Sequence, residues 1–167
     1  KIDGISASLN YKNGNFTKGL SRGDGEEGED ITENLKTIKD IPLTILHKDF
    51  PNEIDIRGEV FIETNDFKKI EKDFANPRNA ASGSLRQKDP KKTELIPLKF
   101  IAYTFGFNSG MKSNKQSDFI KDLNRWGFKT SELNKTIKGI NNLVKYHSDI
   151  EKRRFKLKYD IDGIVYK

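Results

Sequence analysis

An Asn-Gly dipeptide between two stretches of alternating residues is the feature that most restricts how this chain can fold. From Ile5 to Tyr11 apolar residues alternate with small polar ones, and the pattern resumes from Phe16 to Leu20. Alternation with a period of two is typical of a strand with one buried face, and Asn13-Gly14 suits the tight turn of a hairpin. The sequence therefore predicts an antiparallel hairpin near the N-terminal end.

Three later stretches also have the composition of strands. Residues 54–62 alternate, with isoleucine and valine on one face and Arg57, Glu59 and Phe61 on the other. Residues 97–107 are the longest apolar stretch and are predicted to form a central strand, and residues 159–167 return to a strand pattern.

Helical patterns fill the intervals between these strands. Asp30 or Thr32 can cap a first helix and Thr64 a second, because their side-chain oxygens can accept from free backbone N–H groups. Two amphipathic patterns cover residues 118–126 and 140–154. The 167 residues are therefore predicted to form a single α+β domain over 1–167, with mixed, largely antiparallel sheets and flanking helices.

Composition narrows the class of protein. The net charge of +6 favours a polyanionic partner, although an excess of lysine over arginine is also what AT-rich coding sequence produces.

The absence of cysteine excludes a disulfide framework and a thiolate zinc site, and it fits a reducing cytoplasm. No apolar run approaches the ~20 residues of a membrane span, so no membrane partner is expected. His47 and His147 have no partner at ligand spacing, so no metal site is predicted on them.

Five segments carry polar residues that do not follow a surface pattern. Lysine becomes a nucleophile only when its amine loses its proton, arginine forks hold phosphate oxygens, and carboxylates hold Mg²⁺ or a ribose hydroxyl. Together the five segments supply these residue types, which is the composition of a phosphoryl-transfer site. Gly4 in the first segment would let the backbone approach a flat ligand. The segments are residues 1–4, 21–25, 57–59, 76–87 and 160–167.

The order of these segments resembles a known family. Lys-x-Asp-Gly at 1–4 with Asp-Gly-Ile-Val-x-Lys at 162–167 is similar to the covalent nucleotidyltransferases, which include polynucleotide ligases and capping enzymes. Residues 22–32, Arg57-Gly58-Glu59-Val60 and the Asn-Pro-Arg run of 76–87 resemble, more narrowly, the adenylation domain of bacterial NAD-dependent DNA ligases. The similarity extends along the whole chain and implies the nucleotidyltransferase fold.

The resemblance implies a covalent mechanism with NAD as the nucleotide donor. Lys1 would attack the α-phosphate, release nicotinamide mononucleotide and hold AMP as a phosphoramidate. Asp3 would orient the nucleophile or place a metal, and Asp162 matches the catalytic carboxylate of the family. Lys167 would approach the α-phosphate and stabilise its charge. Mg²⁺ is the expected metal, for which Mn²⁺ can substitute.

The same resemblance implies contacts to the nucleotide and to DNA. Arg22 would contact the ribose or a phosphate of the nucleotide, and Glu59 would bind the ribose of adenosine. Arg78, Arg86 and Arg154 match arginines that act on the adenylated nick through phosphates. The expected partner is nicked double-stranded DNA, sealed during replication and repair by a cytoplasmic monomer.

The sequence is expected to be a fragment of a longer ligase, truncated at both ends. The family carries a glutamate two positions before its nucleophile and a separate N-terminal domain that recognises the nicotinamide half. Its oligonucleotide-binding, zinc, helix-hairpin-helix and BRCT parts follow the adenylation domain, and zinc is expected only there. The isolated fragment is therefore expected to be incomplete for NAD activation.

Two rival functions remain open. An enzyme of the same class could use ATP, as ATP-dependent ligases and capping enzymes do, although the Asn-Pro-Arg run argues against it. A basic domain could also bind nucleic acid without catalysis. The joint presence of Lys1, Glu59, Asp162 and Lys167 argues against this second reading.

Some charged residues have simple structural interpretations. Arg57 is predicted to pair with Glu59 on its own strand face. Asp24 and Asp30 could be caps or turn formers, and Asp160 is predicted to be solvated or structural.

Overall fold

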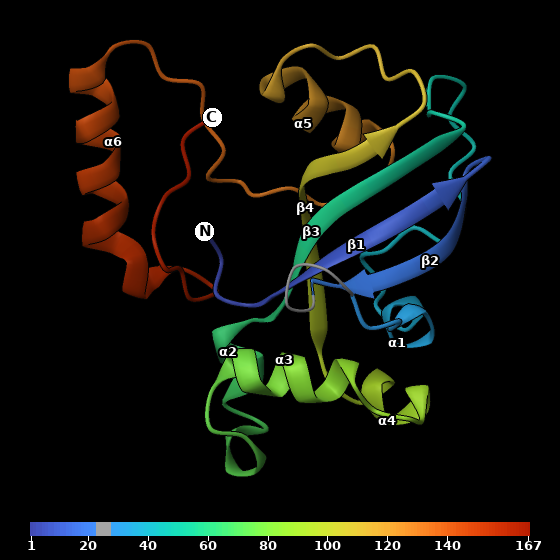
Figure 1. The fold of residues 1–167 in the computed structure, drawn as a ribbon. Coiled ribbons are helices and arrows are strands. Elements are labelled where there is room, and N and C mark those ends of the chain that lie inside the picture. The colour runs from blue at the N-terminus through green and yellow to red at the C-terminus, as the bar shows by residue number, and fades with distance from the viewer. Residues whose placement is uncertain (23–27) are drawn as a thin grey trace.

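The structure, a computed structural model, describes residues 1–22 and 28–167. Within them, one antiparallel sheet has the strand order β2–β1–β3–β4. β1 (Ile5–Lys12) and β2 (Asn15–Ser21) form the predicted hairpin, which turns through Asn13 and Gly14 at φ 49° and 77°. Both residues need a left-handed backbone, which Asn and Gly adopt most readily. Figure 1 shows this hairpin beside β3 (Glu53–Ile62). The prediction of an α+β fold with a largely antiparallel sheet is confirmed.

β4 (Leu98–Asn108) lies at the edge of the sheet, so the prediction of a central strand was wrong. Its outer backbone groups are nevertheless paired with other segments. The Asp40 carboxylate accepts from the Phe100 N–H at 3.2 Å, and the Lys129 carbonyl accepts from the Ala102 N–H at 2.9 Å. An edge that is covered in this way can be as apolar as a central strand.

The predicted strand at 159–167 is also absent. Its one β-type contact is an isolated antiparallel bridge between Ile161 and Ile2. Residues 160–163 pair with the first three residues of the chain instead of joining the sheet. Alternation can predict an extended segment, but it does not say which partner the segment takes.

The helices lie around the sheet, with α5 at one end of it, α6 at its side and α2, α3 and α4 at the other end (Figure 1). Ile31 and Glu63 occupy the N-cap positions of α1 and α2, so the predicted caps at Asp30, Thr32 and Thr64 were wrong. The helices are α1 (Thr32–Lys36), α2 (Thr64–Phe67), α3 (Pro77–Leu85), α4 (Pro90–Glu94), α5 (Gln116–Arg125) and α6 (Ile140–Arg153), with 3₁₀ turns at Glu71–Asp73 and Arg154–Lys156.

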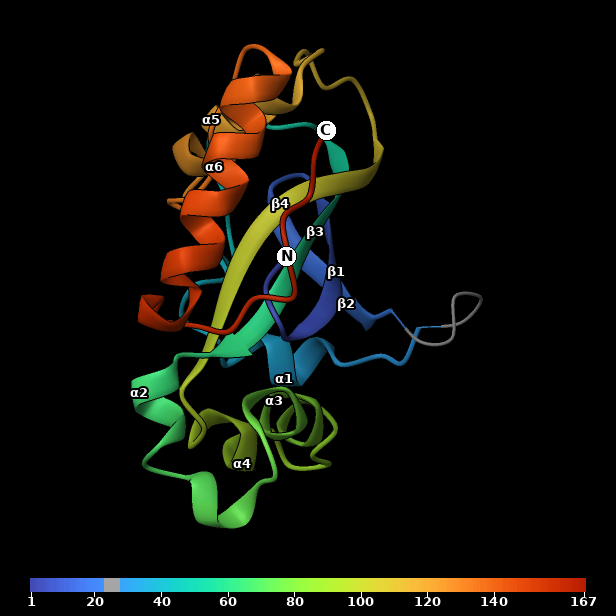
Figure 2. The ribbon, with the colours of Figure 1, turned by 90° about the vertical axis from the view of Figure 1, so that its left-hand side faces the viewer.

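The sheet has one apolar and one polar face. Leu9, Ile56 and Phe100 are fully buried on the apolar face, where α1, α3 and α5 contribute side chains to the same core. On the opposite face the three neighbouring strands β1, β3 and β4 present serine, acidic and tyrosine side chains. In Figure 2, α6 and the C-terminal segment lie beside the sheet. The polar face and these segments together enclose the groove described below.

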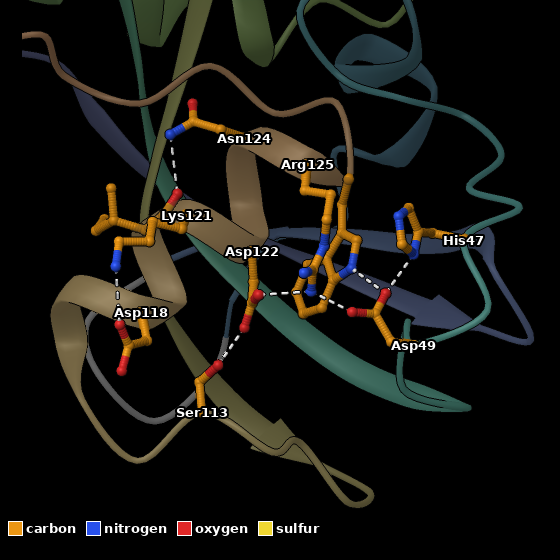
Figure 3. Close-up of polar contacts among 10 residues, drawn as sticks. His47, Asp49, Ser113, Asp118, Lys121, Asp122, Asn124 and Arg125 are labelled. Atoms are coloured by element: carbon orange, nitrogen blue, oxygen red, sulfur yellow. Dashed lines mark hydrogen bonds and ion pairs between the residues drawn. The ribbon is translucent and has the colours of Figure 1, made fainter.

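An ionic network attaches α5 to the loop that follows α1 (Figure 3). Asp49 accepts a hydrogen bond from the Trp126 indole at 3.1 Å and is paired with both Arg125 and His47. Arg125 also contacts Asp122 at 2.6 Å. Burial alone would raise the pKa of Asp49, but these donors and charges outweigh it and hold the pKa below its usual value. The network therefore fixes α5 against the core from the side away from the groove.

No helix in the described parts of the chain is both long and apolar enough to cross a membrane.

Candidate active site

The N-terminal segment and residues 160–163 form a short antiparallel ladder. The Asp3 N–H donates to the Asp160 carbonyl at 2.9 Å, and the Asp162 N–H donates to the Lys1 carbonyl at 2.8 Å. The ladder brings together two motifs that stand at opposite ends of the chain. The side chain of Asp160 is exposed, while its backbone serves the ladder, which agrees with the structural interpretation.

The ladder places the Lys1 ammonium against the Asp162 carboxylate, and the two form an ion pair. The hydrogen bond from Lys1 is the main reason why the pKa of Asp162 lies below its usual value. An ammonium held in this way is a poor nucleophile, because its lone pair carries a proton. The described state is therefore an ion pair that holds the Lys1 side chain beside Asp162.

Arg78 ties the first turn of α3 to this ladder. Its Nη1 donates to Asp3 Oδ1 at 3.2 Å. α3 begins where the sequence predicts, because Pro77 occupies its first turn and Asn76 accepts from the Asn79 N–H at 2.8 Å. The Asn-Pro-Arg run thus sets the helix start that points Arg78 at Asp3.

Glu59 is the carboxylate of this region that forms no ion pair within the described ranges. Ser6 faces it across β1 and β3, and the Ser6 hydroxyl donates to Glu59 Oε2 at 3.0 Å. Burial raises the pKa of Glu59, against the opposing effects of the Ser6 hydrogen bond and the positive charges of Arg78 and Lys1. The carboxylate is thus half-buried, oriented and open to a ligand.

A groove of about 1070 Å³ runs between the polar face of the sheet, α3, α5, α6, the segment 131–137 and the C-terminal segment. The volume is that of a pocket for a nucleotide-sized ligand. Six predicted site residues line it: Lys1, Arg22, Glu59, Arg78, Arg86 and Lys167.

Three other predicted site residues, Asp3, Asp162 and Arg154, do not line the groove. Asp3 and Asp162 support Arg78 and Lys1 from outside the lining. Arg154 follows α6, and its Nη2 donates to the Ile161 carbonyl at 3.0 Å. In this state Arg154 supports the ladder and does not face the groove.

Arg86 lines the groove and forms an ion pair with Glu29. Its Nε contacts Glu29 Oε2 at 3.0 Å, and its side chain is 63% exposed. Arg22 also lines the groove, directly before the part of the chain that lies outside the described residues. The prediction for Asp24 falls in that part.

Comparison with known proteins agrees with this arrangement. The model of the NAD-dependent DNA ligase adenylation domain matches residues 1–167. The chain belongs to this family.

The chain also matches curated relatives over its whole length. A DNA ligase of Pelagibacter ubique is 65% identical over 167 residues. DNA ligases of Parvibaculum lavamentivorans and Xanthobacter autotrophicus are each 46% identical over 175 aligned positions. The chain spans only 24–25% of the length of these relatives.

One detail of this adenylation domain differs from expectation. Arg57 pairs with Asp55, with Nε 3.1 Å from Oδ2, so the predicted pairing with Glu59 was wrong. A Cβ at Gly4 would overlap the Val60 carbonyl oxygen, so packing against β3 already requires this glycine, which also lines the groove.

Asp30 is a turn former, as one interpretation predicted. Its Oδ1 accepts from the Thr32 N–H at 3.0 Å and from the Thr32 hydroxyl at 2.6 Å. The hydrogen bond from that hydroxyl is the main reason why the pKa of Asp30 lies below its usual value.

No group of three or more potential metal-binding side chains occurs in the residues that the structure describes. His47 contacts Asp49, and His147 Nδ1 lies 2.7 Å from the Tyr166 hydroxyl.

Sequence reasoning missed two polar residues beside Glu59. Ser6 lies directly opposite Glu59 in the β1–β3 register, and Tyr103 lies on β4. Both line the groove. A small polar residue at an alternating strand position is an ordinary solvent-facing pattern, so only the cross-strand register shows that Ser6 belongs to the site.

Proposed function

We propose that residues 1–167 are a single domain, the nucleotidyltransferase core of an NAD-dependent DNA ligase, in which Lys1 becomes covalently adenylated. The observation that carries this proposal is the Lys1–Asp162 pair at the wall of a groove that Glu59, Arg22 and Lys167 also line. Membership of the adenylation-domain family supports NAD as the nucleotide donor and DNA as the final substrate.

In the first step the Lys1 amine attacks the α-phosphorus of NAD. The Lys1 proton passes to Asp162 and then to solvent, because the low pKa of Asp162 prevents it from keeping the proton. An N–P bond forms, the attacking nitrogen loses a second proton to solvent, and the P–O bond to the nicotinamide mononucleotide half breaks with its electron pair. Starting from the Lys1 ammonium, the products are lysyl-AMP, nicotinamide mononucleotide with its phosphate as the dianion, and two protons.

Positively charged side chains of the groove can stabilise the negative charge that develops on the phosphate oxygens during the attack. Arg22 and Lys167 line the same wall as Lys1, where they can contact phosphate oxygens. Asp3 and Asp162 fit the usual Mg²⁺ arrangement of one or two carboxylates together with substrate phosphates. Bound Mg²⁺, or Mn²⁺ in its place, would supply additional positive charge at the α-phosphate.

In the later steps AMP passes from Lys1 to the 5′-phosphate of a nick, and the 3′-hydroxyl then displaces AMP and seals the strand. Arg78 and Arg86, whose side chains are 52% and 63% exposed, can exchange their carboxylate partners for phosphates. Arg154 would join them after leaving the Ile161 carbonyl. Because these contacts neutralise phosphates, nick binding should weaken steeply as salt rises.

We propose the same setting that the resemblance implies for the whole protein. It would act as a cytoplasmic monomer on nicked double-stranded DNA in replication and repair. The segments that complete NAD activation would come from the sequence flanking this chain in its gene.

The deciding experiment measures the intact mass of the complete gene product after incubation with Mg²⁺ and either NAD or ATP. A gain of one AMP is expected with NAD only, and it should disappear in Lys1→Ala. Lys12→Ala is the matched control, because Lys12 pairs with Glu53 away from the groove and its loss should leave the AMP gain intact.

Two outcomes would contradict the proposal. A mass gain with ATP only would assign the chain to the ATP-dependent class. No gain with either nucleotide, from folded protein freed of bound AMP, would leave a nucleic-acid-binding domain without catalysis.

A further inference from the structure

We propose that Ser6 and Tyr103 are positioning residues that hold the Glu59 carboxylate so that one of its oxygens faces a hydroxyl donor in the groove. This inference deepens the proposed function, on which it rests, because it names the residues that hold Glu59 in position. The ligand group that Glu59 would receive is the ribose hydroxyl that the family resemblance already implies.

The arrangement comes from three adjacent strands. Ser6 of β1 is the direct cross-strand partner of Glu59 on β3, and Ile101 of β4 is the partner of Glu59 on its other side. Tyr103 lies two residues beyond Ile101, at an irregularity in the β3–β4 register, and it lines the same groove. Ser6 and Glu59 are thus held by regularly paired backbone, which places side chains more accurately than loops do, and Tyr103 reaches them from the irregular position.

The hydrogen bonds that link Tyr103, Ser6 and Glu59 have a defined direction. The Tyr103 hydroxyl donates to Ser6 Oγ at 3.4 Å, and Ser6 Oγ donates to Glu59 Oε2 at 3.0 Å. A serine hydroxyl has a single proton to donate, and an ionised carboxylate can only accept. Ser6 therefore occupies Oε2, and Glu59 Oε1 has no partner among the described side chains.

The charges around Glu59 select the ligand. The facing groups are Lys1 and Asp3 of the N-terminal segment, Arg78 of α3, and Tyr103 of β4. Burial raises the pKa of Tyr103, so its hydroxyl stays protonated and remains a donor. The half-buried Glu59 makes no direct ion pair within the described ranges, so a phosphate placed in contact with it would meet its negative charge, which the more distant Lys1 and Arg78 offset only in part. A hydroxyl would instead donate a hydrogen bond to the free oxygen of the carboxylate.

The Ser6 hydroxyl also favours the ionised state of Glu59. Burial raises the pKa of Glu59, and the hydrogen bond from Ser6 is the largest of the opposing effects. Without that hydroxyl the pKa of Glu59 rises further, and the carboxylate is protonated over a wider range of pH. A protonated carboxyl is a weaker acceptor for a sugar hydroxyl.

The same sheet face offers a matched control. Ser8 lies two residues after Ser6 and donates to Asp55, and neither Ser8 nor Asp55 lines the groove. Ser6→Ala and Ser8→Ala therefore remove the same hydroxyl from the same strand face. Both break a serine–carboxylate hydrogen bond, and only the first lies in the proposed ligand site.

The experiment measures the single-turnover rate of lysyl-AMP formation by the complete gene product, across NAD concentrations and from about pH 5 to pH 8. Ser6→Ala should raise the half-saturating NAD concentration about tenfold, the effect of losing one hydrogen bond to a charged group. The maximal rate constant should change much less. The acid limb of the pH profile should move to higher pH, because Glu59 must be ionised and its pKa is higher without Ser6.

Three further variants separate positioning from general damage. Ser6→Thr keeps the hydroxyl and should restore most of the NAD affinity. Ser8→Ala should leave both the half-saturating concentration and the pH profile unchanged. Tyr103→Phe keeps the ring and removes only the hydroxyl, so it should weaken NAD about threefold and can replace Ser6→Ala if that variant does not fold.

Several results would overturn the inference. They are equal effects of Ser6→Ala and Ser8→Ala, a fall in the maximal rate without a change in half-saturation, and a Tyr103→Phe variant identical to the unchanged protein. Failure of the proposed function is distinguishable, because the unchanged protein would then gain no AMP from NAD.

Discussion

The polar face of the sheet carries two similar serine–carboxylate pairs with different surroundings. At the groove end Ser6 of β1 donates to Glu59 of β3, and at the far end Ser8 donates to Asp55. Asp55 is only 7% exposed and also pairs with Arg57. Glu59 has no ion-pair partner among the described residues and lines the groove.

Under the proposed function, this difference separates a structural carboxylate, Asp55, from one that would bind a ligand, Glu59. A buried acid with a hydrogen bond and a cation is satisfied within the fold. A half-buried acid with a hydrogen bond alone keeps a raised pKa and an open acceptor, which a hydroxyl can complete. Two serines on one strand thus support two different tasks, and the position of the nearest arginine decides which.

The largest effect should come from neutralising each acid in turn. Glu59→Gln should lower the second-order rate constant of lysyl-AMP formation about a hundredfold, because the ligand loses its charged acceptor. Asp55→Asn should change that constant less than about twofold, since Asp55 lies outside the groove. Rapid-quench adenylation assays on the complete gene product measure both, and equal losses would remove the distinction between the two ends.

A smaller effect should follow from disturbing the far end alone. A Cβ at Gly106 would overlap Asp55 Oδ2 and lie 2.7 Å from Nη2 of Arg57. Gly106→Ala should therefore lower the free energy of unfolding by about 2 kcal/mol, measured by urea denaturation. Folded Gly106→Ala protein should still form lysyl-AMP at the normal rate. A slow adenylation step at full folding would show that the far end also serves the ligand.

The smallest effect is the pH dependence of stability that Glu59 contributes. Its pKa is higher in the folded state than in the unfolded chain, so the folded state binds more protons between the two values. The free energy of unfolding therefore falls as pH rises from the unfolded pKa of about 4.3 through the raised folded value. Because Glu59 is partly exposed, the decline should stay below about 1 kcal/mol.

Glu59→Gln lacks this decline, so it should be slightly more stable than the unchanged protein at neutral pH while it is far less active. Urea titrations at several pH values measure the difference. A Glu59→Gln variant with the same pH slope as the unchanged protein would show that Glu59 does not titrate abnormally.

Local patterns predicted the hairpin, the two faces of β3 and the start of α3, because each depends on residues close in sequence. They failed for β4 and for residues 159–167, whose positions depend on partners far along the chain. Asp40 and Lys129 make an apolar edge strand possible, and nothing in residues 97–107 indicates them.

Residues of the candidate site could be predicted where a sequence motif identifies them. They could not be predicted where only the pairing of two strands brings them to the site. Lys1, Glu59 and Arg78 line one groove, as their motifs suggest. Ser6 enters the site only through its position opposite Glu59, and Arg154 faces the Ile161 carbonyl and not the groove. The pairing of Arg57 with Asp55 also depends on rotamer choice along one strand face, which alternation does not specify.

The ladder between residues 1–3 and 160–163 has a consequence for biosynthesis. Lys1 and Asp162 are 161 positions apart, so the carboxylate that holds the lysine leaves the ribosome long after it. At a synthesis rate of about 5–20 residues per second, the delay is roughly 8–30 s. During that interval the hairpin, β3 and β4 can already assemble on the nascent chain, whereas the Asp162 carboxylate is not yet available to the Lys1 side chain. The Lys1–Asp162 pair therefore forms only after all four strands of the sheet have been synthesised.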